Sequence, residues 1–285
     1  MATYSRKSEL YADGVESVSV VHERGRGIAW RIWPGAHVLL DWLESNKADW
    51  CLNPCHCVEI GAGVGLVGVV CAGLGASRVT LTDLEEELPA LARSRDSNET
   101  IVRDRIHVMP LSFGVDEELD AVANQQKENL VVVGSELIYW ESLFEPIART
   151  LQRFAHEHNA TIYIGYRKRV WKTEKRFFTK VLGQVGLDCE VLGQWLATEE
   201  DGVSQKTDGQ VIYNTSEDGE WDTRVYRIFA KPISAKSIVA EDIDEWEGKR
   251  SKAPKSHAPK IEAEMDDAKK KPKKIVRQEK KGRVR

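Results

Sequence analysis

This sequence lacks long apolar runs and has no apolar segment near its start. Its longest apolar run, residues 64–76, is interrupted by four glycines and is too short to cross a bilayer. The first residues, MATYSRKSELYADG, lack the apolar core of a secretory signal. We therefore expect a soluble intracellular protein, cytoplasmic and/or nuclear, that does not enter the membrane.

Cysteine is also scarce, and its spacing argues against a metal site. Three of the five cysteines lie in CLNPCHC, at Cys51, Cys55 and Cys57, with His56 among them. Their spacing is C-x3-C-x-C, and no second Cys/His pair stands at zinc-knuckle distance. We expect reduced thiols around the start of a strand, and no metal.

Charge is unevenly distributed along the chain. The net charge is −4, yet residues 249–285 carry 15 basic and 5 acidic side chains, so residues 1–248 form an acidic body. Residues 234–285 contain few apolar side chains and many like charges, which predicts a disordered basic tail. Its KKKPKKIVRQEKK stretch is either a nuclear-import or anionic-surface segment, or a passive solubilising tail.

Apolar strand patterns alternate with helical patterns along the rest of the chain. Asn129 opens NLVVVGSE, a continuous apolar run typical of a strand buried on both faces of a parallel sheet. This order predicts an α/β, doubly wound, mostly parallel sheet, with its ligand beyond the carboxyl ends of the strands. Residues 198–210 read as a long inserted loop. Strands are expected at 58–61, 79–82, 106–109, 129–136, 161–166, 188–195 and 223–232, and helices at 64–73, 85–98, 143–157 and 173–185.

A glycine turn follows the first of these strands, in VEIGAGVGLVG. Dinucleotide-binding turns have the pattern G-x-G-x-x-G, and their third glycine lets the helix pack closely on the strand. Counted from Gly61 and Gly63, that third position is Leu66. The pattern is instead E-x-G-x-G-x-G from Glu59, which suits a cofactor without a pyrophosphate.

An acidic residue ends the next strand, 20 positions after Gly63. A carboxylate at Asp83 can accept hydrogen bonds from ribose hydroxyls, which dinucleotides and S-adenosylmethionine both possess. Together with the missing third glycine, it favours S-adenosylmethionine over a nicotinamide cofactor.

Four segments resemble one known family: WPGAHVLLDWLE from Trp33, VEIGAGVGLVGVV from Val58, VTLTDLEE from Val79 and VVVGSELIY from Val131. The chain is similar to class I, seven-β-strand methyltransferases with a Rossmann-like sheet, and within them to the family-16 protein-lysine methyltransferases of the methyltransferase-like 21 group. The resemblance implies an N-terminal extension at 1–32, a methyltransferase domain at 33–233 and a tail at 234–285. It also implies cofactor-binding roles for Trp33, Gly61, Ala62, Gly63, Asp83, Phe113 and Ser135.

The catalytic motif implied by the resemblance departs from the family pattern. The family typically has Asp-x-x-Tyr after the fourth strand of its sheet, whereas this chain has Glu136 and Tyr139, so the carboxylate sits one methylene farther out. Our hypothesis is that Glu136 captures and orients the lysine ammonium, while Tyr139 lines its channel.

The sequence therefore predicts a monomeric methyltransferase that acts on a lysine of a protein substrate and uses S-adenosylmethionine. One alternative is a methyltransferase of nucleic acid or small molecules. The acidic body argues against nucleic acid, because it repels phosphates, and such contact would depend on the basic tail. The other alternative is a binding protein of the same fold that has lost its activity.

Overall fold

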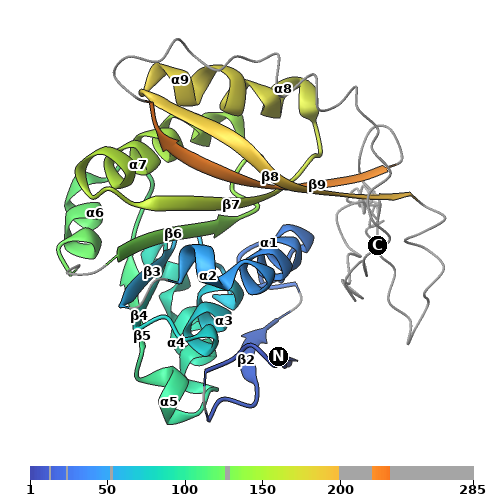
Figure 1. The fold of residues 1–285 in the computed structure, drawn as a ribbon, viewed down its shortest axis with the longest axis vertical. Coiled ribbons are helices and arrows are strands. Elements are labelled where there is room, and N and C mark those ends of the chain that lie inside the picture. Colours follow the sequence, from blue (N-terminus) through green and yellow to red (C-terminus); the bar gives the residue numbers. More distant parts are fainter. Residues whose placement is uncertain (13, 24, 52–53, 126–128, 199–219, 232–285) are drawn as a thin grey trace, which may run out of the picture.

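Seven strands form one central sheet, and helices pack against it (Figure 1). The computed structural model describes the chain except residues 13, 24, 52–53, 126–128, 199–219 and 232–285. Along the sheet the order is β5-β4-β3-β6-β7-β9-β8. The strands are β3 (Cys55–Glu59), β4 (Arg78–Asp83), β5 (Ile106–Pro110), β6 (Asn129–Ser135), β7 (Thr161–Arg167), β8 (Leu187–Thr198) and β9 (Glu220–Ala230).

The predicted seven-stranded, mostly parallel sheet is confirmed. Strands β5, β4, β3, β6 and β7 pair in parallel, and β9 alone runs antiparallel, between β7 and β8. The apolar run of β6 is buried from Leu130 to Gly134, as a central parallel strand requires. After β3 the chain adds β4 and then β5 on one side of β3, and it later adds β6 on the opposite side of β3. The carboxyl ends of β3 and β6 therefore form the switch point where a ligand is expected.

Helices cover both faces of the sheet (Figure 1). Side chains alternate across each strand, so neighbours such as Cys57 and Val58 belong to two separate apolar cores. One face carries α1 (Pro34–Ser45), α3 (Leu66–Leu74), α4 (Leu88–Asp96) and α5 (Thr100–Arg103), and the other carries α6 (Asp116–Ala123), α7 (Phe144–Glu157) and α9 (Leu182–Gln184). Shorter elements are α2 (Lys47–Trp50), α8 (Trp171–Arg176), the 3₁₀ turns η1 (Glu85–Glu87) and η2 (Glu141–Leu143), and the π turn η3 (Phe177–Val181).

Three predicted helices differ from the structure at their ends or in their winding. The helix expected from residue 64 begins at Leu66, because Gly65 caps it with φ +78°. The helix expected at 85–98 is shorter and follows a 3₁₀ turn. The helix expected at 173–185 starts at Trp171 and widens into the π turn, where Phe177 and Phe178 are both buried.

The described part of residues 1–32, predicted as an extension, contributes side chains to the core of the domain. Here β1 (Ala2–Arg6) and β2 (Val18–His22) form an antiparallel hairpin, and Val18 and Val20 are buried against α3 and α4. Arg6 pairs with Asp41 at 2.7 Å and Glu44 at 2.8 Å on α1. The boundary at residue 33 stays a prediction, although side chains from both sides of it share one core.

Other predictions fall partly or wholly outside the described residues. The predicted tail at 234–285 and nearly all of the predicted loop at 198–210 lie there. Within the described part of the chain, no helix is long and apolar enough to span a membrane.

Candidate active site

The glycine turn lies between β3 and α3 at the carboxyl edge of the sheet. Gly61 and Gly63 have backbone φ values of +57° and +56°, which residues other than glycine rarely adopt. A Cβ on Gly61 would stand 2.6 Å from Leu137, and one on Gly63 would stand 2.7 Å from the carbonyl oxygen of Ala29. The turn therefore needs glycine both for its backbone shape and for the space around it.

Asp83, at the end of β4, is joined to this turn. Its Oδ2 accepts a hydrogen bond from the backbone N–H of Gly63 at 2.7 Å, and its Oδ1 accepts one from Leu84 at 2.8 Å. Burial raises the pKa of the carboxyl group, and the two backbone donors oppose that effect. Because a carboxylate has about four acceptor positions, Asp83 can still accept hydrogen bonds from ribose hydroxyls.

Glu59 has a structural contact beneath the turn. The residue is 2% exposed, and its Oε2 accepts a hydrogen bond from the N–H of Gly68 at 2.7 Å. Burial raises the pKa of Glu59 to about 8. The carboxyl group thus ties the end of β3 to α3.

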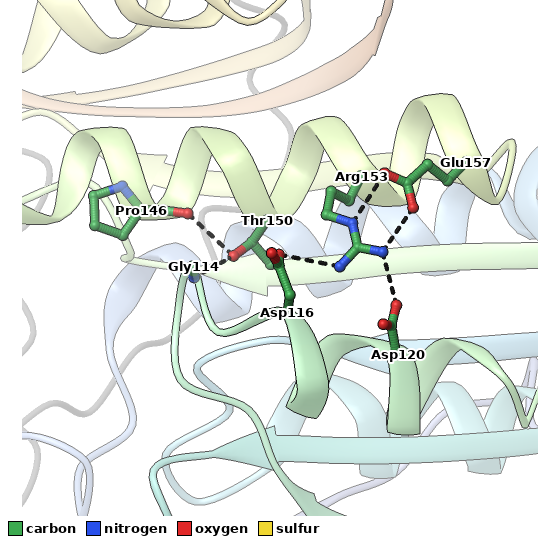
Figure 2. A network of polar contacts seen from close by, with 7 residues as sticks. All are labelled: Gly114, Asp116, Asp120, Pro146, Thr150, Arg153 and Glu157. Carbon is green, nitrogen blue, oxygen red and sulfur yellow. Dashed lines mark hydrogen bonds and ion pairs between the residues drawn. The ribbon is translucent and has the colours of Figure 1, made fainter.

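Phe113 reaches the same turn from the loop after β5. A Cβ on Gly61 would lie 3.2 Å from its ring. The next residue, Gly114, donates its N–H to the Thr150 hydroxyl of α7 at 2.9 Å, and Thr150 donates to the carbonyl oxygen of Pro146 at 3.1 Å (Figure 2). Helix α7 therefore anchors the loop that carries Phe113.

Arg153 joins α6 and α7 beside this anchor. Its guanidinium pairs with Asp116 at 3.1 Å, Asp120 at 2.7 Å and Glu157 at 2.7 Å (Figure 2). These residues line a cavity of about 480 Å³ that also includes Gly114 and Thr150. Since Arg153 already has three carboxylate partners, we interpret the network as a brace between the two helices.

Glu136 follows β6 and is held from several directions. Its φ is +59°, and its backbone N–H donates to the carbonyl oxygen of Gly165 at 2.8 Å. Oε1 accepts the N–H of Gly35 at 2.7 Å and lies 3.9 Å from Nε of Arg167. Oε2 pairs with the guanidinium of Arg169. Both carboxylate oxygens are thus engaged, and the residue is 5% exposed.

Tyr139 follows Glu136 by three positions and is half-buried. Burial raises the pKa of its hydroxyl group, Asp83 raises it further and Arg169 lowers it, so the three side chains are within electrostatic reach of one another. The Tyr139 ring lies 4.8 Å from that of Trp140, which is 56% exposed. An aromatic pair therefore borders the site on the solvent side.

Trp33 stands directly before α1, as its N-cap residue. Its Nε1 donates to the carbonyl oxygen of Ile28 at 3.0 Å, and the guanidinium of Arg169 lies 5.9 Å from the ring centroid. Ser135, the last residue of β6, is half-buried and pairs with Gly165 of β7. Ser135 thus directly precedes Glu136, and Trp33 lies near Arg169, the partner of Glu136.

The structure brings the predicted residues to one edge of the sheet and adds four that the sequence did not indicate. These are Ala29, Gly35, Arg167 and Arg169. No pattern in the sequence pairs Arg167 or Arg169 with Glu136. Contacts with Ala29 and Gly35 depend on chain segments brought together by folding.

The described residues fit an adenosine-containing cofactor. Asp83 offers carboxylate oxygens beside a turn that has no room for side chains, and Phe113 offers a ring next to Gly61. No group of three or more potential metal ligands occurs in the described part of the chain. His56, from the cysteine-rich stretch, contacts Thr80 through Nε2 at 2.8 Å.

Comparisons with known proteins agree with this geometry. Residues 15–184 match a family model described as lysine methyltransferase. The chain is 30% identical over 184 residues to mouse EEF1A lysine methyltransferase 3, covering 64% of this chain and 75% of that protein. It is 32% identical over 156 residues to zebrafish protein N-lysine methyltransferase METTL21A, covering 54% and 67%.

Among solved structures, the glycopeptide N-methyltransferase MtfA complexed with S-adenosylmethionine is a distant neighbour, 11% identical, with a TM-score of 0.42 over 68% of this chain and 94% of that one. The family match covers more than half of the chain and includes the glycine turn, Asp83 and Glu136. The chain therefore belongs to the lysine methyltransferase family and is an S-adenosylmethionine-dependent protein-lysine N-methyltransferase.

Proposed function

We propose that the cofactor lies across the carboxyl ends of β3, β4 and β6. Asp83 accepts hydrogen bonds from the ribose, Phe113 lies against the adenine, and the glycine turn passes close to the cofactor. The contact of Phe113 with Gly61 and the contact of Asp83 with Gly63 support this arrangement. The proposed cofactor-binding set is Trp33, Gly61, Ala62, Gly63, Asp83, Phe113 and Ser135.

The lysine substrate is proposed to enter beside Tyr139 and Trp140. The bound cofactor supplies an electrophilic methyl group, and the amine must be neutral to accept it. An ordinary lysine with a pKa near 10.4 costs about 4.6 kcal/mol to deprotonate at pH 7. Desolvation of the amine beside the half-buried Tyr139 ring lowers the amine pKa and so reduces that cost.

The sequence-based hypothesis that Glu136 captures the lysine ammonium stays a prediction. It now has a structural requirement, because the Glu136 carboxylate already holds the Gly35 N–H and Arg169. A lysine ammonium would have to replace the guanidinium of Arg169 at Oε2.

A protein surface with apolar and basic groups is the substrate class that we propose. Three loops at the carboxyl edge each place an exposed apolar side chain directly before an exposed acid: Leu84–Glu85, Val115–Asp116 and Trp140–Glu141. We call these three pairs the rim. Asp116 and Glu141 already pair with Arg153 and Arg176, so Glu85 is the rim acid that we propose to attract a lysine-bearing surface and to repel phosphate backbones. The relatives named for protein lysines, one of them for EEF1A, agree with a protein substrate.

We also propose that the protein acts as a monomer in the cytoplasm, the nucleus or both. Cys51, Cys57, Cys71 and Cys189 are free thiols, as suits a reducing compartment. The basic sequence at 249–285 is proposed to act in nuclear import. Deleting these residues and following the protein's location tests that role, and an unchanged nuclear signal would reject it.

Transfer of labelled methyl groups tests the function directly. The full-length protein is incubated with labelled S-adenosylmethionine and a cell lysate, beside Asp83→Asn, which replaces the charged carboxylate with a neutral amide. A protease-sensitive labelled band that disappears with the variant would support a protein substrate. Label in nuclease-sensitive material would instead support the nucleic-acid alternative.

A further inference from the structure

Glu136 links three parts of the chain in the folded protein. It ends β6, it accepts a hydrogen bond from Gly35 in the first turn of α1, and it pairs with Arg169 in the segment after β7. A Cβ on Gly35 would stand 2.7 Å from Oε1, so this position needs glycine for the carboxylate to approach the helix. We call Glu136, Gly35 and Arg169 the clamp.

The clamp is electrostatically favourable in its present form. The first turn of a helix carries partial positive charge, so the Gly35 N–H is a strong donor to a carboxylate. Arg169 adds a full positive charge, and Arg167 adds another at 3.9 Å. Nε and Nη1 of Arg167 have no hydrogen-bond partner among the described residues. Glu136 is therefore the carboxylate that pairs with this buried cation, and Glu174 adds a smaller favourable charge.

The clamp also fixes the residue proposed to lie against the cofactor. Trp33 stands two positions before Gly35, with only Pro34 between them. Arg169 lies 5.9 Å from the Trp33 ring centroid while it pairs with Glu136. Two separate contacts, through α1 and through Arg169, thus connect Glu136 to Trp33.

Capture of an ammonium by Glu136 would break this arrangement. The Glu136 side chain is 4% exposed, and its two oxygens already hold a backbone N–H and a guanidinium. Removing one partner of a buried ion pair is costly, because the other charge is left uncompensated. Arg169 would have to leave Glu136 each time a substrate bound.

We infer that Glu136 is a positioning residue: with Gly35 and Arg169 it holds Trp33 in place for the cofactor, and it does not contact the lysine amine. The inference rests on the proposed cofactor role of Trp33. It assigns Arg169 to the same task, although no sequence pattern singles out that residue. The amine side of the site is then formed by Tyr139 and Trp140.

A double-mutant cycle on cofactor binding tests the inference without a substrate. Affinity for S-adenosylmethionine is measured by calorimetry for the wild type, Glu136→Gln, Arg169→Gln and the double variant. We expect each single variant to bind about tenfold more weakly. The double variant should be no weaker than the poorer single variant, because both changes remove the same pair. A Gln at 136 retains an oxygen that can accept the Gly35 N–H.

Arg6→Gln is the matched control. Arg6 also pairs with carboxylates on α1 and its side chain is 14% exposed, but it lies in the hairpin. Its affinity for the cofactor should equal that of the wild type. Should Glu136→Gln fail to fold because Arg167 loses its buried counter-charge, Arg169→Gln alone carries the test.

Three results would overturn the clamp. Unchanged cofactor affinity in Arg169→Gln, or in a folded Glu136→Gln, would leave ammonium capture as the better role for Glu136. A double variant about 100-fold weaker than the wild type would show that the two residues act independently. A wild-type protein without measurable cofactor affinity would reject the cofactor site itself, and the clamp with it.

Discussion

Gly63 and Gly25 share a left-handed backbone conformation but differ in what surrounds them. Their φ values are +56° and +78°, and a Cβ would meet the Ala29 carbonyl oxygen at 2.7 Å in the first case and nothing within 4 Å in the second. The backbone cost of a side chain in this conformation is about 1–2 kcal/mol at either position. Comparing alanine substitutions at the two glycines therefore separates the effect of backbone strain from the effect of a steric clash.

Gly63→Ala is predicted to abolish measurable cofactor binding, because the glycine turn must move away from Ala29 and with it the Asp83 contact. Gly25→Ala should lower the melting temperature slightly and leave the affinity for S-adenosylmethionine unchanged. Calorimetry and thermal melting on both variants check this. Equal affinity in the two variants would show that the space at Gly63 is not needed.

The raised pKa of Glu59 predicts that the stability of the fold depends on pH. Its pKa is raised to about 8 in the folded protein, from about 4.5 when unfolded. Its contribution to the free energy of unfolding is therefore fully present below pH 4.5 and is lost as the pH rises through 8. Glu59→Gln, which stays neutral, should not lose stability in this way.

The difference in melting temperature between Glu59→Gln and the wild type should therefore grow in favour of the variant from pH 6.5 to pH 8.5. The lowered pKa values of His37 and His56, both about 4, affect stability mainly below this window. Their contributions, and those of other groups, cancel in the comparison of two otherwise identical chains. A difference that is constant with pH would mean that Glu59 does not titrate in this range.

Among the elements, α7 contributes to the site without touching it. Its Thr150 holds Gly114, and Gly114 is next to Phe113, the residue proposed to lie against adenine. The Arg153 brace fixes α7 relative to α6 (Figure 2). The position of Phe113 thus depends on how α6 and α7 pack against each other.

Thr150→Val is predicted to weaken cofactor binding severalfold. The change removes the hydroxyl group that accepts the Gly114 N–H and donates to Pro146, so the loop that carries Phe113 loses its anchor on α7. Thr150→Ser retains the hydroxyl group and should bind the cofactor like the wild type. If valine lowered the melting temperature without changing the affinity, the anchor would serve stability alone.

For the molecule as a whole, we propose that the rim contributes to the choice of the protein substrate. Trp140 is its largest exposed side chain, at 56%. A tryptophan at the centre of an interface can contribute about 2 kcal/mol or more to binding. The protein substrate is therefore expected to lose much of its affinity when this ring is removed.

Trp140→Ala should reduce methylation of the labelled protein band about tenfold at limiting substrate, while affinity for the cofactor stays unchanged. Leu10→Ala is the control, because Leu10 is 46% exposed and lies in the amino-terminal segment away from the rim. Equal methylation by the two variants would show that Trp140 of the rim does not take part in substrate binding.

Much of the framework could be predicted because it is encoded locally. The apolar run of β6, the glycines of the turn and Asp83 after the next strand each follow from a short pattern with a physical reason. The helix ends were less predictable, since the π turn at 177–181 accompanies the burial of two neighbouring aromatic rings. The roles of the predicted site residues stay predictions, although the structure gathers these residues at one edge of the sheet.

The sequence by itself determined the order of strands and helices, the turn that admits a cofactor and the acid that ends β4. Tertiary structure decided what Glu136 contacts. Gly35 is 101 positions before Glu136 and Arg169 is 33 after it, and no local pattern relates the three. They meet because β6 and β7 pair in parallel beneath α1, which places a helix amino terminus and an arginine on one buried carboxylate.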